Sequence, residues 1–185
     1  AEQLGTADSI ILIASTSKVT FAGAGIAFLG ASEFNLASFK RYLDAMTIGP
    51  DKVNQLRHVK FLKDMPTVFD HMQRHREILA PKFACVHSHL EQGLQGMGRW
   101  TQPEGGYFVS FDARPGLART IVRMAAEAGV KLTPAGAAFP YGNDPEDANL
   151  RLAPSYPPFE EVDRAMRVFV TCVQLATVRQ ALEQA

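Results

Sequence analysis

A lysine that follows three hydroxyl side chains is the feature of this sequence best suited to chemistry. Residues 15–17 are Ser, Thr and Ser, Lys18 comes next, and the apolar, β-branched run of residues 9–14 precedes them. Such a run is typical of a strand buried on both faces of a mostly parallel sheet. Burial at its end favours the neutral amine of Lys18, which can attack an aldehyde to form an imine. The neighbouring hydroxyls and the amides of the glycine-rich residues 22–25 could bind a phosphate dianion.

A simpler interpretation of the same residues remains open. Lys18 could extend from a strand end to the surface, with residues 15–17 forming an ordinary turn, and spacing alone does not decide between the two roles. Residues 9–31 are also apolar enough to resemble a membrane span. Because a lysine at the middle of a span is costly, we expect no membrane partner.

The bulk composition narrows the class of protein. Nineteen basic residues balance nineteen acidic ones, so no net field would attract nucleic acid. The two cysteines, Cys85 and Cys172, have neither metal-binding spacing nor the numbers of a disulfide framework. His71 and His75 are four residues apart, but no glutamate follows His71 as in a metalloprotease helix. We therefore expect a cytoplasmic protein with no metal site and no nucleic-acid partner.

The remaining pattern alternates strands and helices and predicts an α/β fold. Helices are indicated by apolar residues at helical spacing, by Asn35 as a cap and by Gly129 as a stop signal. A long amphipathic segment after Pro66 resembles a spine that joins two domains. The predicted strands are residues 9–14, 26–30, 107–111 and 150–153, and the predicted helices are residues 35–46, a segment beginning at Asp51, the segment after Pro66, and residues 117–128 and 159–182.

Four sequence blocks occur in the order found in one known enzyme family. They are S-T-S-K at residues 15–18, I-G-P-D-K-V-N-Q-L-R-H at 48–58, P-E-G-G-Y-F at 103–108 and N-L-R-L-A-P at 149–154. Together they resemble the fold-type I aminotransferases that depend on pyridoxal 5′-phosphate (PLP). The first two blocks, with the run of residues 14–28, resemble the aspartate aminotransferase branch often called type Ic.

This resemblance implies a division into three parts. Residues 1–62 would be the C-terminal remnant of a large PLP-binding domain, residues 63–95 a long linking helix, and residues 96–185 the small C-terminal α/β domain. The family fold begins well before the point that matches Ala1. The resemblance therefore also implies a fragment of a longer polypeptide that is inactive alone.

The activity implied by the resemblance is transamination. An amino group would pass between aspartate and a 2-oxo acid such as 2-oxoglutarate through a PLP Schiff base on Lys18, in an enzyme that is a homodimer at full length. Ser15 and Ser17 would bind the cofactor beside Lys18, and Arg151 would bind the substrate α-carboxylate, a task suited to a permanently charged, bidentate donor. From the residues alone, an ordinary surface ion pair between Arg151 and the acidic residues of 144–147 is the more common outcome.

The sequence also departs from the family pattern. Many relatives carry a phosphate-binding arginine shortly after the lysine, whereas residues 22–27 here are A-G-A-G-I-A. Lys52 and Asn54 are weak candidates for replacing it. Two other functions remain open, namely the aminotransferase-like effector domain of a transcription regulator and a pseudo-enzyme fragment that docks a partner. Residues upstream of Ala1 would distinguish a regulator, because its winged-helix DNA reader would lie there.

Overall fold

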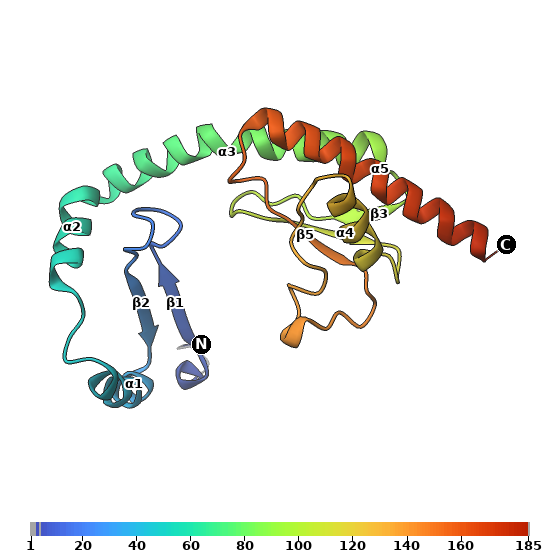
Figure 1. The fold of residues 1–185 in the computed structure, drawn as a ribbon. Coiled ribbons are helices and arrows are strands. Elements are labelled where there is room, and N and C mark those ends of the chain that lie inside the picture. The colour runs from blue at the N-terminus through green and yellow to red at the C-terminus, as the bar shows by residue number, and fades with distance from the viewer. Residues whose placement is uncertain (1–2, 4, 185) are drawn as a thin grey trace. The chain divides into compact units, whose positions relative to one another are not determined.

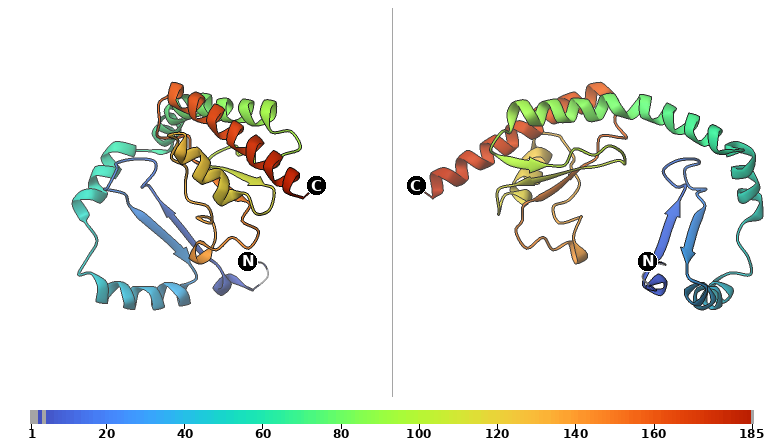
Figure 2. Two further views of the ribbon diagram at one scale, coloured as in Figure 1. Left: turned by 45° about the vertical axis from the view of Figure 1, so that its right-hand side comes forward. Right: turned by 180° about the vertical axis from the view of Figure 1, so that it is seen from behind.

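The computed structural model describes residue 3 and residues 5–184, and the chain divides into two compact units. Unit 1 is Ala1–Arg74 and unit 2 is His75–Ala185. Helix α3 (Met65–Gly93) contributes residues to both units. Figures 1 and 2 show the elements in chain order, coloured from blue at the N-terminus to red at the C-terminus.

Unit 1 begins with two short antiparallel strands. β1 (Ile11–Ser15) pairs with β2 (Ala27–Ala31). All five residues of β1 are exposed, and the apolar side chains of Leu12 and Ile13 are 69% and 75% exposed. The predicted burial on both faces of a mostly parallel sheet is therefore wrong for the described residues. The physical reason is that β1 has only β2 as a partner, and a two-stranded pair covers neither of its own faces.

The helices of unit 1 begin at side-chain caps. The hydroxyl of Ser32 accepts a hydrogen bond from the N–H of Asn35 at the start of α1 (Glu33–Met46), and the carboxylate of Asp51 caps α2 (Lys52–Leu62) in the same way. These bonds satisfy N–H groups that have no partner within the helix. The predicted start at Asp51 is confirmed. The predicted cap at Asn35 is wrong, because α1 begins two residues earlier, at Glu33, and Ser32 is its cap.

Unit 2 contains a three-stranded antiparallel sheet that helices cover on one face. The strand order is β3 (Gly98–Trp100), β4 (Val109–Ala113), β5 (Asn149–Leu152). Buried residues alternate with more exposed ones along β4 and β5, as expected of a sheet with one covered face. The C-terminal part of α3, together with α4 (Ala118–Glu127) and α5 (Phe159–Glu183), packs on that face (Figures 1 and 2).

The buried hydrophobic side chains of the described residues all lie in unit 2. Phe111 of β4 and Phe169 of α5 are fully buried, and their rings meet edge to face with centroids 5.2 Å apart. Gly98 of β3 lies against Phe111, because a Cβ at this position would be 2.5 Å from the ring. Burying each large apolar side chain contributes roughly 1.5–3 kcal/mol. Other members of this core are Val86, Leu90, Leu94, Val109, Ile121, Leu150, Met166 and Val173.

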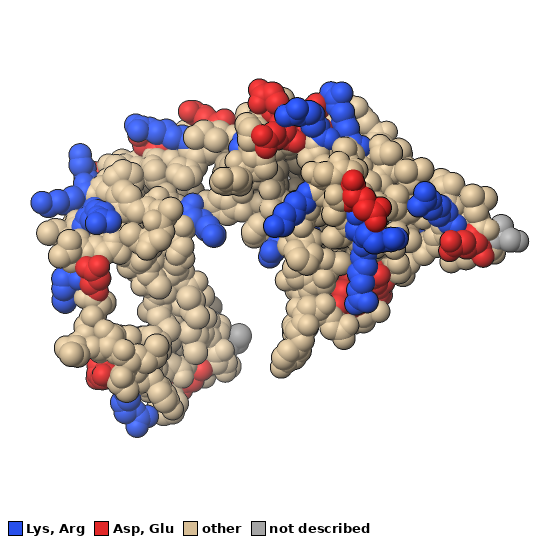
Figure 3. All heavy atoms as spheres, in the orientation of Figure 1, with Lys and Arg blue, Asp and Glu red and all other residues tan. Residues whose placement is uncertain are grey.

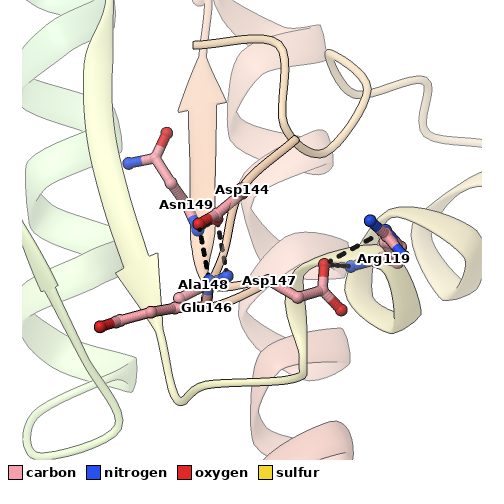
Figure 4. A network of polar contacts seen from close by, with 6 residues as sticks. All are labelled: Arg119, Asp144, Glu146, Asp147, Ala148 and Asn149. Carbon is pink, nitrogen blue, oxygen red and sulfur yellow. Dashed lines mark hydrogen bonds and ion pairs between the residues drawn. The ribbon is translucent and has the colours of Figure 1, made fainter. Parts of the chain in front are cut away.

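A polar network fixes the loop that leads into β5 (Figure 4). The buried carboxylate of Asp144 accepts three hydrogen bonds from backbone N–H groups, those of Glu146 (3.1 Å), Ala148 (2.8 Å) and Asn149 (2.8 Å). These bonds, led by that of Asn149, lower the pKa of Asp144 below its ordinary value, although burial acts in the opposite direction. The loop therefore depends on an ionised Asp144, which sets where β5 begins.

On the face of the molecule drawn in Figure 3, charged side chains are interspersed rather than gathered by sign. Figure 3 shows acidic and basic groups side by side on the face in view. Between residues 9 and 32, Lys18 is the only charged residue of the sequence. No helix in the described part of the chain is long and apolar enough to cross a membrane.

Most of the predicted elements are confirmed. α4 ends just before Gly129, whose φ of +86° is the left-handed conformation typical of a helix stop. The predicted strand 107–111 is shifted by two residues, to β4. The predicted long helix begins at Met65 and takes in most of residues 63–95. The division of the chain into three functional parts stays a prediction.

Candidate functional site

The loop that carries Lys18 is closed by backbone hydrogen bonds. The N–H of Thr16 donates to the carbonyl of Ile26 over 2.8 Å, and the N–H of Ile26 donates to the hydroxyl of Thr16 over 2.9 Å. The N–H groups of Val19 and Thr20 then donate to the carbonyl of Thr16. Lys18 therefore lies in a turn whose backbone is fixed on both sides.

A buried histidine of α2 holds this turn. His58 is 3% exposed, and its Nε2 lies 3.1 Å from the hydroxyl of Thr16 and 2.7 Å from that of Thr20. Its Nδ1 lies 2.9 Å from the carbonyl of Asn54, which can only accept. In the neutral ring, Nδ1 therefore donates to Asn54, and the single lone pair of Nε2 accepts from one of the two hydroxyls. Both ring nitrogens are used, so the imidazole has a fixed orientation.

Two further side chains of unit 1 bind the backbone of the loop. The Nδ2 group of Asn54 donates to the carbonyl of Ala24 over 2.9 Å, and Nε2 of His71 donates to the carbonyl of Val19 over 2.6 Å. The Oδ1 atom of Asn54 is buried and has no hydrogen-bond partner among the described residues. Residues of α2 and of the first turns of α3 thus position the loop.

The hydroxyls of Ser15 and Ser17 lie next to each other beside Lys18. The Ser15 hydroxyl donates to that of Ser17 over 3.2 Å, and both residues are exposed. Gly25 is required opposite them, because a Cβ there would be 2.5 Å from Oγ and 2.9 Å from Cα of Ser17. Lys18 is also exposed. The burial expected for its amine is therefore not provided by the described residues, since the strand before it is uncovered.

Arg151 lies on the uncovered face of the unit 2 sheet, opposite Ser110 of β4. Its guanidinium carbon is 4.6 Å from the ring centroid of Phe108, a cation–π arrangement. Its Nε atom is buried without a hydrogen-bond partner among the described residues, and Arg151 makes no ion pair there. The alternative of an ion pair with the acidic residues of 144–147 is therefore not formed.

The polar neighbours of Arg151 on this face satisfy one another. The Nδ2 group of Asn149 donates to the hydroxyl of Ser110 over 2.9 Å and to the carboxylate of Asp112 over 2.6 Å. The carboxylate of Asp112 is thereby engaged away from the guanidinium. Arg151 is left as a partly exposed cation whose orientation is set by Phe108.

The predicted site residues divide between the two units. Ser15, Ser17, Lys18, Lys52 and Asn54 lie in unit 1, and Arg151 lies in unit 2. Lys52 is exposed at the start of α2, whereas Asn54 holds the Lys18 loop. The sequence analysis did not predict which side chains fix this loop. The helical spacing of Asn54 and His58, four residues apart, was the pattern that could have indicated them. The missed residues are Thr20, His58 and His71. The hydroxyl of Thr16 was expected to bind phosphate, but it is buried, accepts from the N–H of Ile26 and contacts Nε2 of His58.

Comparison with known proteins identifies the fold. The crystal structure of an aspartate transaminase from Corynebacterium glutamicum matches 97% of this chain, and 43% of its own chain, with a TM-score of 0.92 and 43% sequence identity. An aspartate aminotransferase from the same organism is 44% identical over 177 residues, 95% of this chain and 41% of its own length. A protein of Mycolicibacterium smegmatis, named as a candidate aminotransferase, is 48% identical over 184 residues, 98% of this chain and 43% of its own length.

These likenesses place the chain among the fold-type I aminotransferases by family, with an α/β fold. A family model described as aspartate amino-transferase matches residues 1–185. The chain belongs to the aspartate aminotransferase family. It spans less than half the length of the curated relatives that it matches.

Proposed function

We propose that this chain supplies part of the active site of a PLP-dependent aminotransferase that moves an amino group between aspartate and a 2-oxo acid such as 2-oxoglutarate. Family membership supports the reaction, and the name of the Corynebacterium glutamicum relative supports aspartate. The observation that carries the proposal is the position of Lys18, the sole charged residue of the β1–β2 segment, in a turn fixed on both sides.

The residues around Lys18 fit a phosphorylated aldehyde. Ser15 and Ser17 present two adjacent, exposed hydroxyls, which can donate to phosphate oxygens. Gly25 lets the backbone approach Ser17 closely. PLP, when bound, supplies an aldehyde for the lysine amine and an electron sink for the substrate. Because no arginine lies in the loop, hydroxyls and backbone amides have to meet a larger share of the phosphate charge.

Lys18 has two roles in this proposal. Its amine would hold PLP through an imine, and the same amine, when free, would take up and return the proton at the substrate α-carbon. Such a positioned base contributes roughly 10²- to 10⁴-fold to a rate. The fixed backbone of Thr16, Val19 and Thr20 limits where the amine can travel.

Arg151 binds the substrate α-carboxylate in this proposal. The planar guanidinium has donors along its edge that match two carboxylate oxygens. Phe108 lies on the face of the guanidinium, so it leaves those edge donors accessible.

The remaining parts of the proposal concern the whole enzyme. The chain acts as part of a longer cytoplasmic polypeptide that forms a homodimer, and the residues present here are not sufficient for turnover. The partial coverage of the relatives and the exposed apolar residues of β1 support this.

A chimera tests the proposed function. These 185 residues would replace the matching residues of the Corynebacterium glutamicum relative, and the protein would be loaded with PLP. Reduction with borohydride followed by peptide mapping should find the cofactor on Lys18, and the assay should detect amino transfer from aspartate to 2-oxoglutarate. Label spread evenly over other exposed lysines, such as Lys40, would contradict the proposal.

A further inference from the structure

Three side chains with different donor atoms meet in unit 2, apart from the residues proposed for catalysis. The sulfur of Cys85, a ring nitrogen of His89 and a carboxylate oxygen of Asp163 all lie within 4.8 Å of one another. The closest pair is Nε2 of His89 and Oδ1 of Asp163, at 2.8 Å. The three residues are partly buried, and the side chains of His89 and Asp163 are 23% and 29% exposed. A small ion can therefore reach them from solvent.

The backbone positions of this cluster are fixed by the core. Cys85 and His89 are four residues apart on α3, so their side chains share one face of the helix. Asp163 projects from α5. Each of the three is next in sequence to a buried core residue, Val86, Leu90 or Val162. The two helices thus hold the three donors in place before any ligand arrives.

We propose that Cys85, His89 and Asp163 form a binding site for a thiophilic divalent cation, with Zn²⁺ as the preferred ion. Thiolate, imidazole and carboxylate are the usual protein ligands of Zn²⁺, at distances of about 2.0–2.3 Å. Three protein ligands leave a fourth tetrahedral position for water. The sulfur favours Zn²⁺ over Mg²⁺, which prefers oxygen ligands.

Arg167 does not need to leave when the ion binds. Its Nη2 atom lies 2.7 Å from Oδ2 of Asp163, whereas His89 contacts Oδ1 of the same carboxylate. The cation would take the place of the proton between His89 and Oδ1, and that proton moves to Nδ1 of the ring, or to solvent where Nδ1 already carries one. Arg167 keeps Oδ2 and orients the carboxylate as an outer partner. The thiol proton of Cys85 is released to solvent when the sulfur binds the metal.

This site departs from the expectation of no metal site that was drawn from the sequence. Cys85 and His89 offer only two donors, and the third comes from a residue 74 positions further along the chain. The competing explanation is that His89 and Asp163 merely form a hydrogen bond that joins α3 to α5. A plain hydrogen bond would not involve Cys85, whereas a metal site would. Removal of the Cys85 thiol therefore distinguishes the two explanations.

Metal titration of the 185-residue chain tests the site independently of the proposed function. Calorimetry should show one Zn²⁺ per chain, and Co²⁺ should give the charge-transfer absorption of a thiolate ligand. Cys85→Ser should abolish this absorption and weaken Zn²⁺ binding by more than about tenfold, because loss of even an outer partner costs roughly 10- to 100-fold. Cys172→Ser is the matched control, because it removes the other thiol and should leave both signals unchanged.

A second variant keeps the test decisive if the first perturbs packing. Asp163→Asn retains the size of the side chain and removes the anionic ligand, so Zn²⁺ binding should weaken while the circular dichroism spectrum is unchanged. Absence of Zn²⁺ binding by the unmodified chain would overturn the proposal. Binding that survives both Cys85→Ser and Asp163→Asn would also overturn it, because the ion would then occupy another site, such as His71 and His75.

Discussion

The two units of the chain differ in what stabilises them. In unit 2, residues of three helices and two strands bury a continuous hydrophobic core. In unit 1, the two buried residues among those described are Thr16 and His58, and both are polar. Large apolar side chains such as Ile13 and Met46 are meanwhile 75% and 82% exposed. Unit 2 is therefore held by burial, whereas the Lys18 loop of unit 1 is held by hydrogen bonds.

This difference separates stability from positioning. The burial of apolar side chains contributes a large total free energy of folding but has no directional preference. One hydrogen bond contributes a net of only about 0.5–1.5 kcal/mol, but it fixes distances and angles. The hydrogen bonds among Thr16, Thr20 and His58 therefore fix the conformation of the loop around Lys18 and add little to the free energy of unfolding. Substitutions in the two units should accordingly affect different measurements.

Loss of Lys18, the lysine proposed to hold PLP, should have the largest effect. In the PLP-loaded chimera, Lys18→Ala should reduce kcat by about 10⁴-fold or more, because it removes both the covalent anchor and a proton carrier. The free energy of unfolding should change by less than about 0.5 kcal/mol, as for other exposed residues. Steady-state kinetics and urea unfolding measure the two quantities. Lys40→Ala is the control and should leave both near their original values; comparable activity loss in the two variants would refute the special role of Lys18.

Loss of a core aromatic should have the next largest effect, and it should be confined to stability. Phe111→Ala should cost about 3–5 kcal/mol of unfolding free energy, because Phe111 is fully buried. Phe28→Ala in β2 is the matched variant, and with a side chain 56% exposed it should cost less than about 1 kcal/mol. Denaturant titration of the 185-residue chain compares them. Equal costs would contradict the contrast between the units.

Loss of the histidine that holds the loop should be smaller and local. His58→Ala removes the contacts of the Thr16 and Thr20 hydroxyls with the imidazole, at a cost of about 1–3 kcal/mol. Hydrogen exchange should accelerate at the amides of Val19 and Thr20 and stay unchanged in β4. Lys60→Ala, an exposed change on the same helix, should leave all these amides protected as before. Uniform acceleration throughout the chain would instead indicate a role in global stability.

Asp144→Asn should lower the free energy of unfolding by about 1–2 kcal/mol near neutral pH. The side-chain amide of asparagine cannot replace all three hydrogen bonds that the Asp144 carboxylate accepts. The pKa of Asp144 is lowered in the folded chain from a reference value of 3.8. Its contribution is therefore fully present above that reference value and is lost as the pH falls through the lower, folded pKa. The difference in unfolding free energy between the original chain and Asp144→Asn should be constant near neutrality and shrink in acid. A difference that grows in acid would have the wrong sign for this mechanism.

Local features of the fold were predictable from sequence, and long-range ones were not. Asp51 and Gly129 mark helix ends through their own backbone preferences, so neighbouring residues are sufficient to interpret them. The exposure of β1 was not predictable, because an apolar run reveals what a strand could bury and not which elements cover it. Contacts such as that of Thr16 with His58 join residues 42 positions apart, beyond the reach of any local pattern.

Candidate site residues followed the same rule. Lys18 and Arg151 were found because the motifs around them are contiguous. The partners that orient them were found only partly. Asn54 was suspected for another task, and Phe108 was part of a motif without a stated role. The unpartnered Nε atom and the cation–π contact of Arg151 came from the structure alone.

The turn at Thr16 has a thermodynamic consequence for any ligand of this loop. Because the backbone of Thr16 is already bonded to Ile26 and its hydroxyl to Ile26 and His58, the conformational freedom of residues 16–20 is lost during folding rather than when a ligand binds. Ordering one backbone residue costs about 1–2 kcal/mol, and a pre-ordered receptor avoids that penalty at the moment of association. A small phosphorylated molecule could then be retained by few contacts, and loosening the turn would weaken affinity without removing any group that touches it.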